Sequence, residues 1–198
     1  MAATIYLVRH CPYQNPQQIM TFRLPGYALN SQGRKKAQEI ADFFKKNSQI
    51  ARIYSSPILR TKQTAQILSK TLNLKPLISS LLIEIDSPFK GIKKRDYYQN
   101  HSGDIYVQKE HLLGVGESIG QINERIAKFI QKVLKENPDK EIIAVSHGDP
   151  IMIYFLSLTA QSLENIDQRK DYIPMGGIIK LIFDENNKLE SFKRINLN

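Results

Sequence analysis

The sequence has a single cysteine, Cys11, and it lacks the run of about twenty apolar residues that a membrane-spanning helix needs. A lone cysteine excludes a disulfide within the chain and fits a reducing compartment. The first residues lead directly into the apolar stretch Ile5–Val8, without the charged head of a secretion signal. We therefore expect a cytoplasmic protein with no membrane partner.

Internal repeats, low-complexity tracts and Gly/Ser-rich linkers are also absent. The chain has 198 residues, of which 41% are hydrophobic and 24% charged, as is usual for a globular domain. We therefore predict one domain over residues 1–198. Nothing in the composition fixes the oligomeric state.

Acidic residues are fewer than basic ones, and the formal net charge is +9. A basic domain attracts phosphate groups, including those of nucleic acids. The basic residues are scattered, however, and the longest clusters are Lys93–Arg95 and the pairs Lys35–Lys36 and Lys45–Lys46. Such pairs are typical of solvated helix faces. We predict an anionic partner that is not a nucleic acid; a nucleic-acid-binding module is an alternative that rests on charge alone.

Strand and helix patterns alternate along the chain. Apolar runs that predict strands occupy Ile5–Val8, 51–55, 76–85, 141–146, 177–183 and 189–195. Apolar residues at helical spacing predict helices that begin near Ser31, Ser56, Ser118 and Asp149. This alternation predicts a three-layer α/β/α fold with a mostly parallel central sheet, in which ligands bind at the carboxyl ends of the strands.

Cap signals mark three of the predicted helix starts. Ser56–Pro57 supplies a cap residue followed by proline. Ser118 with Gln121 forms a capping-box pattern. Asp149–Pro150 precedes an almost wholly apolar segment that extends through Leu158. We expect the last of these helices to be central in the fold.

Reactive polar side chains follow three of the predicted strands. The first strand ends at Arg9–His10, the second leads through Ser56 to Arg60, and the strand over 141–146 ends at His147. Because parallel strands present their carboxyl ends at one edge, we expect two imidazoles and two guanidiniums to converge there. Arg60 also lies in the first turn of its predicted helix, where backbone N–H groups favour an anion.

This combination of side chains suits phosphoryl transfer. Two guanidiniums can bind phosphoryl oxygens through paired hydrogen bonds and stabilise the charge of the transition state. Neighbouring cations lower the pKa of an imidazole, which keeps His10 neutral and nucleophilic. The leaving oxygen needs a proton, and Glu84 is the best-placed carboxyl group by sequence, with Asp86 and Glu117 as rivals.

Zinc binding is an alternative interpretation of the two histidines. Neither a cysteine pair nor a helical histidine pair accompanies them, and the adjacent arginines would repel a cation. We therefore predict no metal and no cofactor.

Several short blocks follow one another in a recognisable order. They are Leu7–His10, Leu24–Tyr27 with Gly33, Tyr54–Ala65, Leu82–Ile85 with Gly91, Gly116–Ser118 and Val145–Gly148. In this order they resemble the histidine phosphatase superfamily, the phosphoglycerate mutase-like proteins, over nearly the whole chain.

The resemblance implies a role for each matching residue. It implies that His10 is the phosphorylated nucleophile and that Glu84 is the general acid that later activates water. The implied phosphate pocket consists of Arg9, Arg60 and His147. The resemblance also implies chemistry without a metal, and it makes Arg23 a candidate substrate contact.

The sequence departs from the family pattern near both ends of the site. Cys11 and Pro12–Tyr13 follow the histidine where the family commonly has glycine and then acidic or hydroxyl residues, and Asn15 lies one position from the usual asparagine. After the acid, Asp86–Gly91 replaces the common Gly-aromatic-acidic pattern. We predict Asn15 and Gly148, together with Arg23, as substrate contacts.

These observations lead to one functional hypothesis and two enzymatic alternatives. We expect a phosphatase that hydrolyses phosphomonoesters of small metabolites through a phosphohistidine. A phosphoglycerate mutase is one alternative. The resemblance implies that such mutases are longer, with an insertion between the acid and the Gly-Glu-Ser block. Here only about thirty residues separate Glu84 from Glu117, with no paired arginines between them, which favours hydrolysis. A protein-phosphohistidine phosphatase is the other. The physiological substrate depends on the loops at 12–30 and 86–115, where the sequence pattern is weakest.

Overall fold

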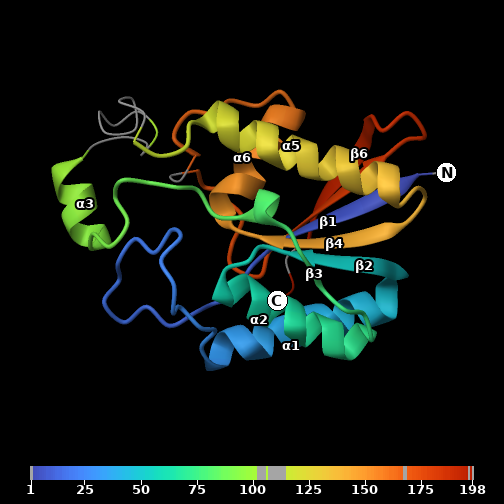
Figure 1. The fold of residues 1–198 in the computed structure, drawn as a ribbon, viewed down its shortest axis with the longest axis horizontal. Coiled ribbons are helices and arrows are strands. Elements are labelled where there is room, and N and C mark those ends of the chain that lie inside the picture. Colours follow the sequence, from blue (N-terminus) through green and yellow to red (C-terminus); the bar gives the residue numbers. More distant parts are fainter. Residues whose placement is uncertain (1, 102–105, 107–114, 167–168, 196, 198) are drawn as a thin grey trace.

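The computed structural model describes residues 2–101, 106, 115–166, 169–195 and 197. Strands and helices alternate along these residues (Figure 1). The strands are β1 (Ala3–Arg9), β2 (Ile50–Ser55), β3 (Leu77–Ile78), β4 (Glu141–Ser146), β5 (Ile178–Phe183) and β6 (Leu189–Ile195). The helices are α1 (Ser31–Asn47), α2 (Leu59–Leu72), α3 (Lys94–Asn100), α5 (Ile119–Glu136) and α6 (Gly148–Leu158), with a 3-10 turn, η1 (Ser80–Leu82).

The strands form one sheet in the order β3-β2-β4-β1-β5-β6. Strands β1 and β2 both pair in parallel with β4, and β3 pairs in parallel with β2. Strand β5 runs antiparallel to β1, and β6 runs antiparallel to β5. The predicted late hairpin therefore forms one edge of the sheet, and the carboxyl ends of β1, β2 and β4 lie side by side.

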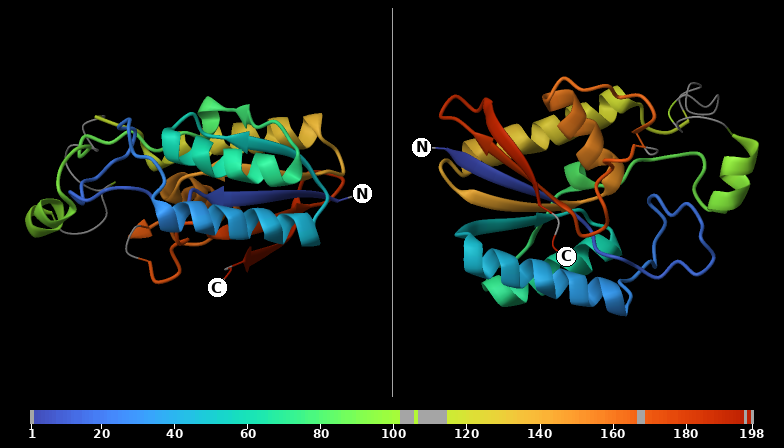
Figure 2. Two further views of the ribbon diagram at one scale, coloured as in Figure 1. Left: turned by 90° about the horizontal axis from the view of Figure 1, so that it is seen from below. Right: turned by 180° about the vertical axis from the view of Figure 1, so that it is seen from behind.

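Helices cover both faces of the sheet (Figures 1 and 2). Helices α1 and α2 lie on one face, and α5 and α6 lie on the other. Alternate side chains of β1 point to opposite faces, so that Ile5 and Leu7 join the α5/α6 core while Tyr6 and Val8 join the α1/α2 core. Burial on both faces explains the uninterrupted apolar run in this strand. The predicted three-layer α/β/α fold is confirmed.

Helix α6 lies deepest in the molecule, as its composition predicts. Nine of its eleven residues are buried, from Gly148 to Leu156. Even so, none of the helices within the described residues is both long enough and apolar enough to cross a membrane.

The segment predicted as a strand over 76–85 is mostly irregular. Only Leu77 and Ile78 pair with β2, and the chain then makes the 3-10 turn η1. Leu82 is buried at the end of this turn, and its carbonyl accepts a hydrogen bond from Ser146 Oγ at 2.8 Å. The turn leads the chain from the outer edge of the sheet back to the end of β4, and it thereby brings Glu84 there.

The helix starts agree with the cap signals in one case and differ in two. Ser118 and Gln121 form the predicted capping box of α5. Helix α2 begins at Leu59, with Ile58 at the N-cap position, and the hydroxyl of Ser56 lies 2.8 Å from His147 Nε2. In α6, His147 holds the N-cap position and Asp149 lies in the first turn.

Two long segments extend beyond the carboxyl edge of the sheet (Figures 1 and 2). One is the loop over 11–30 and the other contains α3. They join each other through a bridge between Ile19 and Lys93, with Met20 N bonded to the carbonyl of Ile92 at 2.8 Å. Helix α3 was not predicted, since its sequence carries no clear apolar period.

Candidate active site

The strand ends bring the predicted histidines together. Arg9 and Ser146 are register partners at the ends of β1 and β4, so His10 and His147 emerge next to each other. Their ring centroids lie 5.3 Å apart, and both side chains are buried. The arrangement follows directly from parallel pairing of two neighbouring strands.

Hydrogen bonds fix the tautomer of His10. Its Nδ1 lies 3.0 Å from the carbonyl oxygen of Cys11, which can only accept, so Nδ1 carries the proton. Its Nε2 accepts a hydrogen bond from Arg60 Nε at 3.1 Å. Burial, together with the positive charges of Arg60 and Arg9, holds the pKa of His10 well below its usual range. The neutral ring therefore keeps an unprotonated Nε2 in the centre of the site.

His147 is neutral for the same reasons. Its Nδ1 accepts a hydrogen bond from Arg60 Nη2 at 3.1 Å, and its Nε2 lies 2.8 Å from Ser56 Oγ. Since Arg60 can only donate, the ring proton of His147 lies on Nε2. Burial and the charge of Arg60 hold the pKa of His147 well below its usual range.

Arg60 occupies the centre of the cluster, in the first turn of α2. Its guanidinium contacts both imidazoles, and Nη2 also donates to the carbonyl of Phe22 at 2.8 Å. The guanidinium of Arg9 lies at the end of β1, where Nη1 donates to the carbonyl of Ile173 at 2.6 Å. Arg60 Nη1 and Arg9 Nε are buried without a hydrogen-bond partner in the part of the chain that the structure describes. Unpaired guanidinium donors in a buried site favour an anion.

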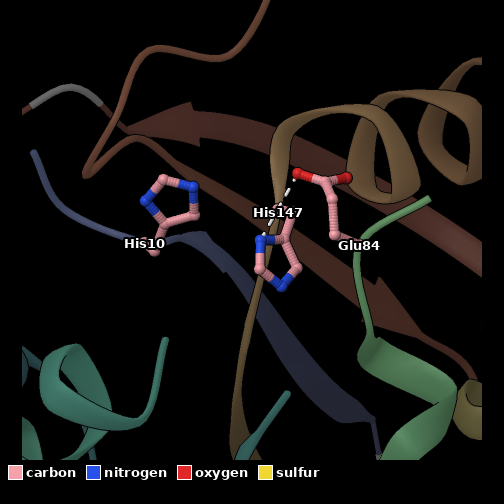
Figure 3. Close-up of side chains that lie close together, drawn as sticks. All are labelled: His10, Glu84 and His147. Atoms are coloured by element: carbon pink, nitrogen blue, oxygen red, sulfur yellow. Dashed lines mark ion pairs between the residues drawn. The ribbon is translucent and has the colours of Figure 1, made fainter. Parts of the chain in front are cut away.

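Glu84 lies beside His147, and the two side chains are within ion-pair distance (Figure 3). Its Oε2 is 3.4 Å from His147 Nδ1 and 3.6 Å from Arg60 Nη2, and its side chain is 13% exposed. Burial and the negative charge of Asp149 raise the pKa of Glu84 to about 7, although Arg60 opposes this. A carboxyl group with this pKa can donate a proton and later accept one near neutral pH.

The rival carboxylate Glu117 is committed to other partners. Its Oε2 accepts from Arg23 Nη2 at 2.5 Å and from the backbone N–H of Asp86 at 3.1 Å, and its Oε1 accepts from Arg125 Nε at 2.8 Å. Arg23 Nε in turn donates to the backbone carbonyl of Glu84 at 2.7 Å. Arg23 therefore links Glu117 to the backbone of Glu84, a role that the sequence pattern did not indicate.

The other two predicted substrate contacts lie in different surroundings. The side-chain amide of Asn15 closes its own loop, with both polar atoms bonded to the backbone of Ile19 at 2.8 and 3.1 Å. Gly148 lies at the start of α6, next to His147 and against Tyr172. Of the two, only Gly148 adjoins the histidine cluster.

Gly148 has no room for a side chain. A Cβ atom there would lie 2.1 Å from the hydroxyl oxygen of Tyr172. We therefore expect Gly148→Ala to displace Tyr172 and to lower the free energy of unfolding by about 1–3 kcal/mol, as overpacking does. Urea denaturation measures this change. In the control, Gly120→Ala, the added atom meets nothing closer than Ser118 Oγ at 3.9 Å, and a loss as large as that of Gly148→Ala would contradict the prediction.

The donor set of the site can also be tested for a metal. Ligand atoms of His10, Glu84 and His147 all lie within 4.8 Å of one another. However, Arg60 Nε lies 3.1 Å from His10 Nε2, and Arg60 Nη2 lies 3.1 Å from His147 Nδ1. A cation bound there would lie against a buried positive charge, so these residues suit an anion better than a metal.

Three further residues around the cluster were not predicted to belong to the site. Tyr172 lies under the Arg9 guanidinium, with 5.1 Å between the guanidinium carbon and the ring centroid. Both Tyr172 and Tyr106 donate hydrogen bonds to Asp149, at 2.5 and 3.0 Å. Asp149 follows His147–Gly148 directly, which is a signal in the sequence, whereas the two tyrosines carry none.

Comparison with known proteins identifies the family pattern. The family model of the histidine phosphatase superfamily (branch 1) matches residues 5–196. Phosphoserine phosphatase 1 of Hydrogenobacter thermophilus is 26% identical over 140 residues, which cover 68% of this chain and 66% of that protein.

Solved structures share the fold. A mycobacterial glucosyl-3-phosphoglycerate phosphatase superposes with a TM-score of 0.77 at 18% identity, covering 98% of this chain and 97% of the other. The phosphoserine phosphatase of Entamoeba histolytica, solved with 3-phosphoglyceric acid, gives a TM-score of 0.74 at 27% identity and covers 96% of each chain.

Proposed function

Because the chain belongs to the histidine phosphatase superfamily, we propose that it is a phosphatase that hydrolyses phosphomonoesters of small metabolites, with His10 as its nucleophile. One observation carries this proposal. The unprotonated Nε2 of His10 lies 3.1 Å from Arg60 Nε, in a buried site where Arg60 Nη1 and Arg9 Nε have no partner among the described residues. A nucleophile surrounded by anion donors suits the attack on a phosphoryl group.

In the first step the lone pair of His10 Nε2 attacks phosphorus. The bond between phosphorus and the ester oxygen breaks, and the proton of Glu84 passes to the leaving oxygen. Arg9 and Arg60 stabilise the charge on the phosphoryl oxygens, where their unpaired donors have no competing partner in the described chain. A bound phosphoryl anion favours the protonated form of His147, which then supplies a further donor.

In the second step Glu84, now ionised, takes a proton from water. The water oxygen attacks the phosphorus of phosphohistidine, the bond to Nε2 breaks, and inorganic phosphate leaves with Glu84 protonated again. The pKa of Glu84 of about 7 suits both directions of proton transfer. Arg9, His10, Arg60, Glu84 and His147 are therefore the proposed catalytic residues, and no step requires a metal.

The relatives support a proposal for the substrate class. Similar proteins are named for phosphoserine and for glucosyl-3-phosphoglycerate, which are small phosphomonoesters. We propose a substrate of that size. The test is a screen of phosphorylated metabolites for phosphate release, with His10→Ala as the blank and with phosphoserine and 3-phosphoglycerate included.

Two further assays separate the proposal from its two alternatives. A mutase would interconvert phosphoglycerates in the presence of the bisphosphate faster than it releases phosphate. A protein-phosphohistidine phosphatase would release phosphate from a phosphohistidine protein and leave small esters intact. Either result would contradict the proposed activity, and the chain would still belong to the histidine phosphatase superfamily.

The pH dependence of kcat/KM follows from Glu84. The first step needs its acid form, and its pKa is about 7. The acid form is complete well below this pH and falls about tenfold per unit above it, so kcat/KM for an alkyl phosphate should fall in the same way on the alkaline side. Steady-state rates from pH 5 to pH 10, compared with the Glu84→Gln variant, which lacks this limb, measure the effect. A wild-type profile that stays flat to pH 10 would contradict it.

A further inference from the structure

Tyr13, in the loop that follows His10, brings an aromatic ring to the centre of the site. Its ring centroid lies 5.3 Å from that of the His10 ring, and the guanidinium carbon of Arg60 lies over the ring, 5.3 Å from its centroid. A guanidinium within about 6 Å of a ring centroid is attracted by the negative face of the ring. Because Arg60 is only 1% exposed, water screens this attraction little.

Hydrogen bonds hold Tyr13 in the loop over 11–30 and join that loop to α2. The Tyr13 hydroxyl lies 3.0 Å from Thr21 Oγ1, and the Tyr13 backbone forms an antiparallel bridge with Leu29. The N–H of Leu29 donates to the side-chain oxygen of Gln63 at 2.7 Å. Gln63 and Arg60 lie close together on α2, so the loop and the helix are joined beside the contact between the ring and the guanidinium.

The polar contacts of Arg60 hold only part of its guanidinium. Nε donates to His10 at 3.1 Å, whereas Nη1 has no hydrogen-bond partner among the described residues. The carboxyl group of Glu84 lies 3.6 Å from Nη2, but it is the acid in the proposed first step and carries no negative charge at that stage. The ring of Tyr13 still attracts the guanidinium then, since this attraction does not depend on the proton of Glu84.

An aromatic ring suits this position better than a carboxylate would. A carboxylate beside Arg60 would occupy guanidinium donors and would repel the negative charge of a phosphoryl group. The ring attracts the cation through its quadrupole and adds no net negative charge. Arg60 is thus held while its own positive charge remains available to an anion.

We propose that Tyr13 is a positioning residue of the phosphate pocket: its ring holds the Arg60 guanidinium beside His10 and leaves the charge of that guanidinium to the phosphoryl group. The inference rests on the proposed function, in which Arg60 binds the phosphoryl oxygens. The contact and its effect on anion binding can nevertheless be measured without turnover.

The test compares three variants at position 13 in the full chain. Tyr13→Phe keeps the ring, whereas Tyr13→Leu and Tyr13→Met replace it with apolar side chains of two shapes. All three lack the hydroxyl, so the comparison isolates the ring. Tyr98→Leu is the matched control, because Tyr98 is 51% exposed on α3.

Two measurements are made on each variant. Isothermal titration calorimetry with inorganic phosphate gives the affinity of the pocket for an anion. NMR of protein labelled with ¹⁵N-arginine follows the Nε–H resonance of Arg60, which the Arg60→Lys variant assigns.

We expect Tyr13→Leu and Tyr13→Met to weaken phosphate binding about 3–30-fold, the range that a cation–π contact provides, because the anion must then order the guanidinium itself. The kcat/KM for an alkyl phosphate should fall by a similar factor, and the Arg60 resonance should move. Tyr13→Phe should keep most of the wild-type affinity, with the Arg60 resonance close to its wild-type position. Tyr98→Leu should change neither.

Two results would overturn the inference. If Tyr13→Phe binds phosphate as weakly as Tyr13→Leu, the hydroxyl contact with Thr21 supports the site and the ring does not. If Tyr13→Leu and Tyr13→Met bind phosphate as tightly as the wild type, the ring is not required.

Failure of this inference can be told apart from failure of the proposed function. If the ring is needed for phosphate binding while the wild type hydrolyses no ester, the proposed function is wrong and the role of Tyr13 stands. If the wild type is an active phosphatase and removal of the ring leaves phosphate binding unchanged, the role of Tyr13 is wrong and the phosphatase stands.

Discussion

Replacing His10 with alanine should lower phosphate release from a phosphomonoester by about 10⁴-fold or more, as loss of a catalytic nucleophile does in other enzymes. The neighbouring thiol of Cys11 cannot take over the attack. Burial raises the pKa of this thiol to about 12, so the reactive thiolate is absent near neutral pH. The measurement is the initial rate of phosphate release with purified variant and wild type.

The control for this prediction is a second histidine. His101 stacks on Tyr97, next to α3, and takes no part in the cluster. His101→Ala should keep most of the wild-type activity. A His10→Ala protein that is folded and retains more than a tenth of the wild-type rate would show that another group makes the attack.

Replacing Glu84 with glutamine should lower kcat/KM for an alkyl phosphate by about 10²–10⁴-fold, the usual contribution of a general acid. The loss should be much smaller for an aryl phosphate, because its leaving oxygen needs less protonation. Since we propose that the same residue activates water, the variant should release the phenol in a rapid burst and then turn over slowly. Stopped-flow absorbance with an aryl phosphate measures both phases.

Glu124→Gln is the matched control for this substitution. Glu124 is exposed on α5 and pairs with Lys128 at 2.7 Å, away from the site. Glu124→Gln should leave kcat/KM for both the alkyl and the aryl phosphate unchanged. Equal losses with alkyl and aryl phosphates in Glu84→Gln would contradict a role in leaving-group protonation and would indicate a role in binding.

The sequence predicted those parts of the site that depend on strand order. His10 and His147 follow directly from short apolar runs that end in a polar residue, and parallel pairing then brings the two rings together. Arg60 was predictable because it lies a few residues beyond the end of β2, at the start of a helix with clear apolar spacing. In each case a local pattern and one topological rule were sufficient.

The surroundings of Glu84 depend on packing between distant segments. The segment predicted as one long strand pairs over two residues only, and η1 returns the chain to the end of β4. Arg23, from the loop over 11–30, holds the backbone of Glu84, and its own carboxylate partner, Glu117, lies 94 residues further along the chain. Such contacts leave no periodic trace in the sequence.

The loops that adjoin the site are the part that the sequence describes least. Helix α3 was not predicted, and much of the segment predicted to govern specificity, over 86–115, lies outside the described residues. Tyr13 is the clearest loop residue at the site, since its ring centroid lies 5.3 Å from both the His10 ring and the Arg60 guanidinium carbon. The assignment of residues 1–198 to one domain also stays a prediction.

The central claim is that the phosphoryl group passes through Nε2 of His10. Rapid quenching of the enzyme with a reactive phosphomonoester, at a pH that preserves phosphohistidine, followed by mass spectrometry of the peptides, tests this directly. The account predicts a phosphorylated peptide that contains His10, formed as fast as the burst and accumulating in Glu84→Gln. Phosphate release at full rate without any such peptide, or with the phosphoryl group on another residue, would contradict it.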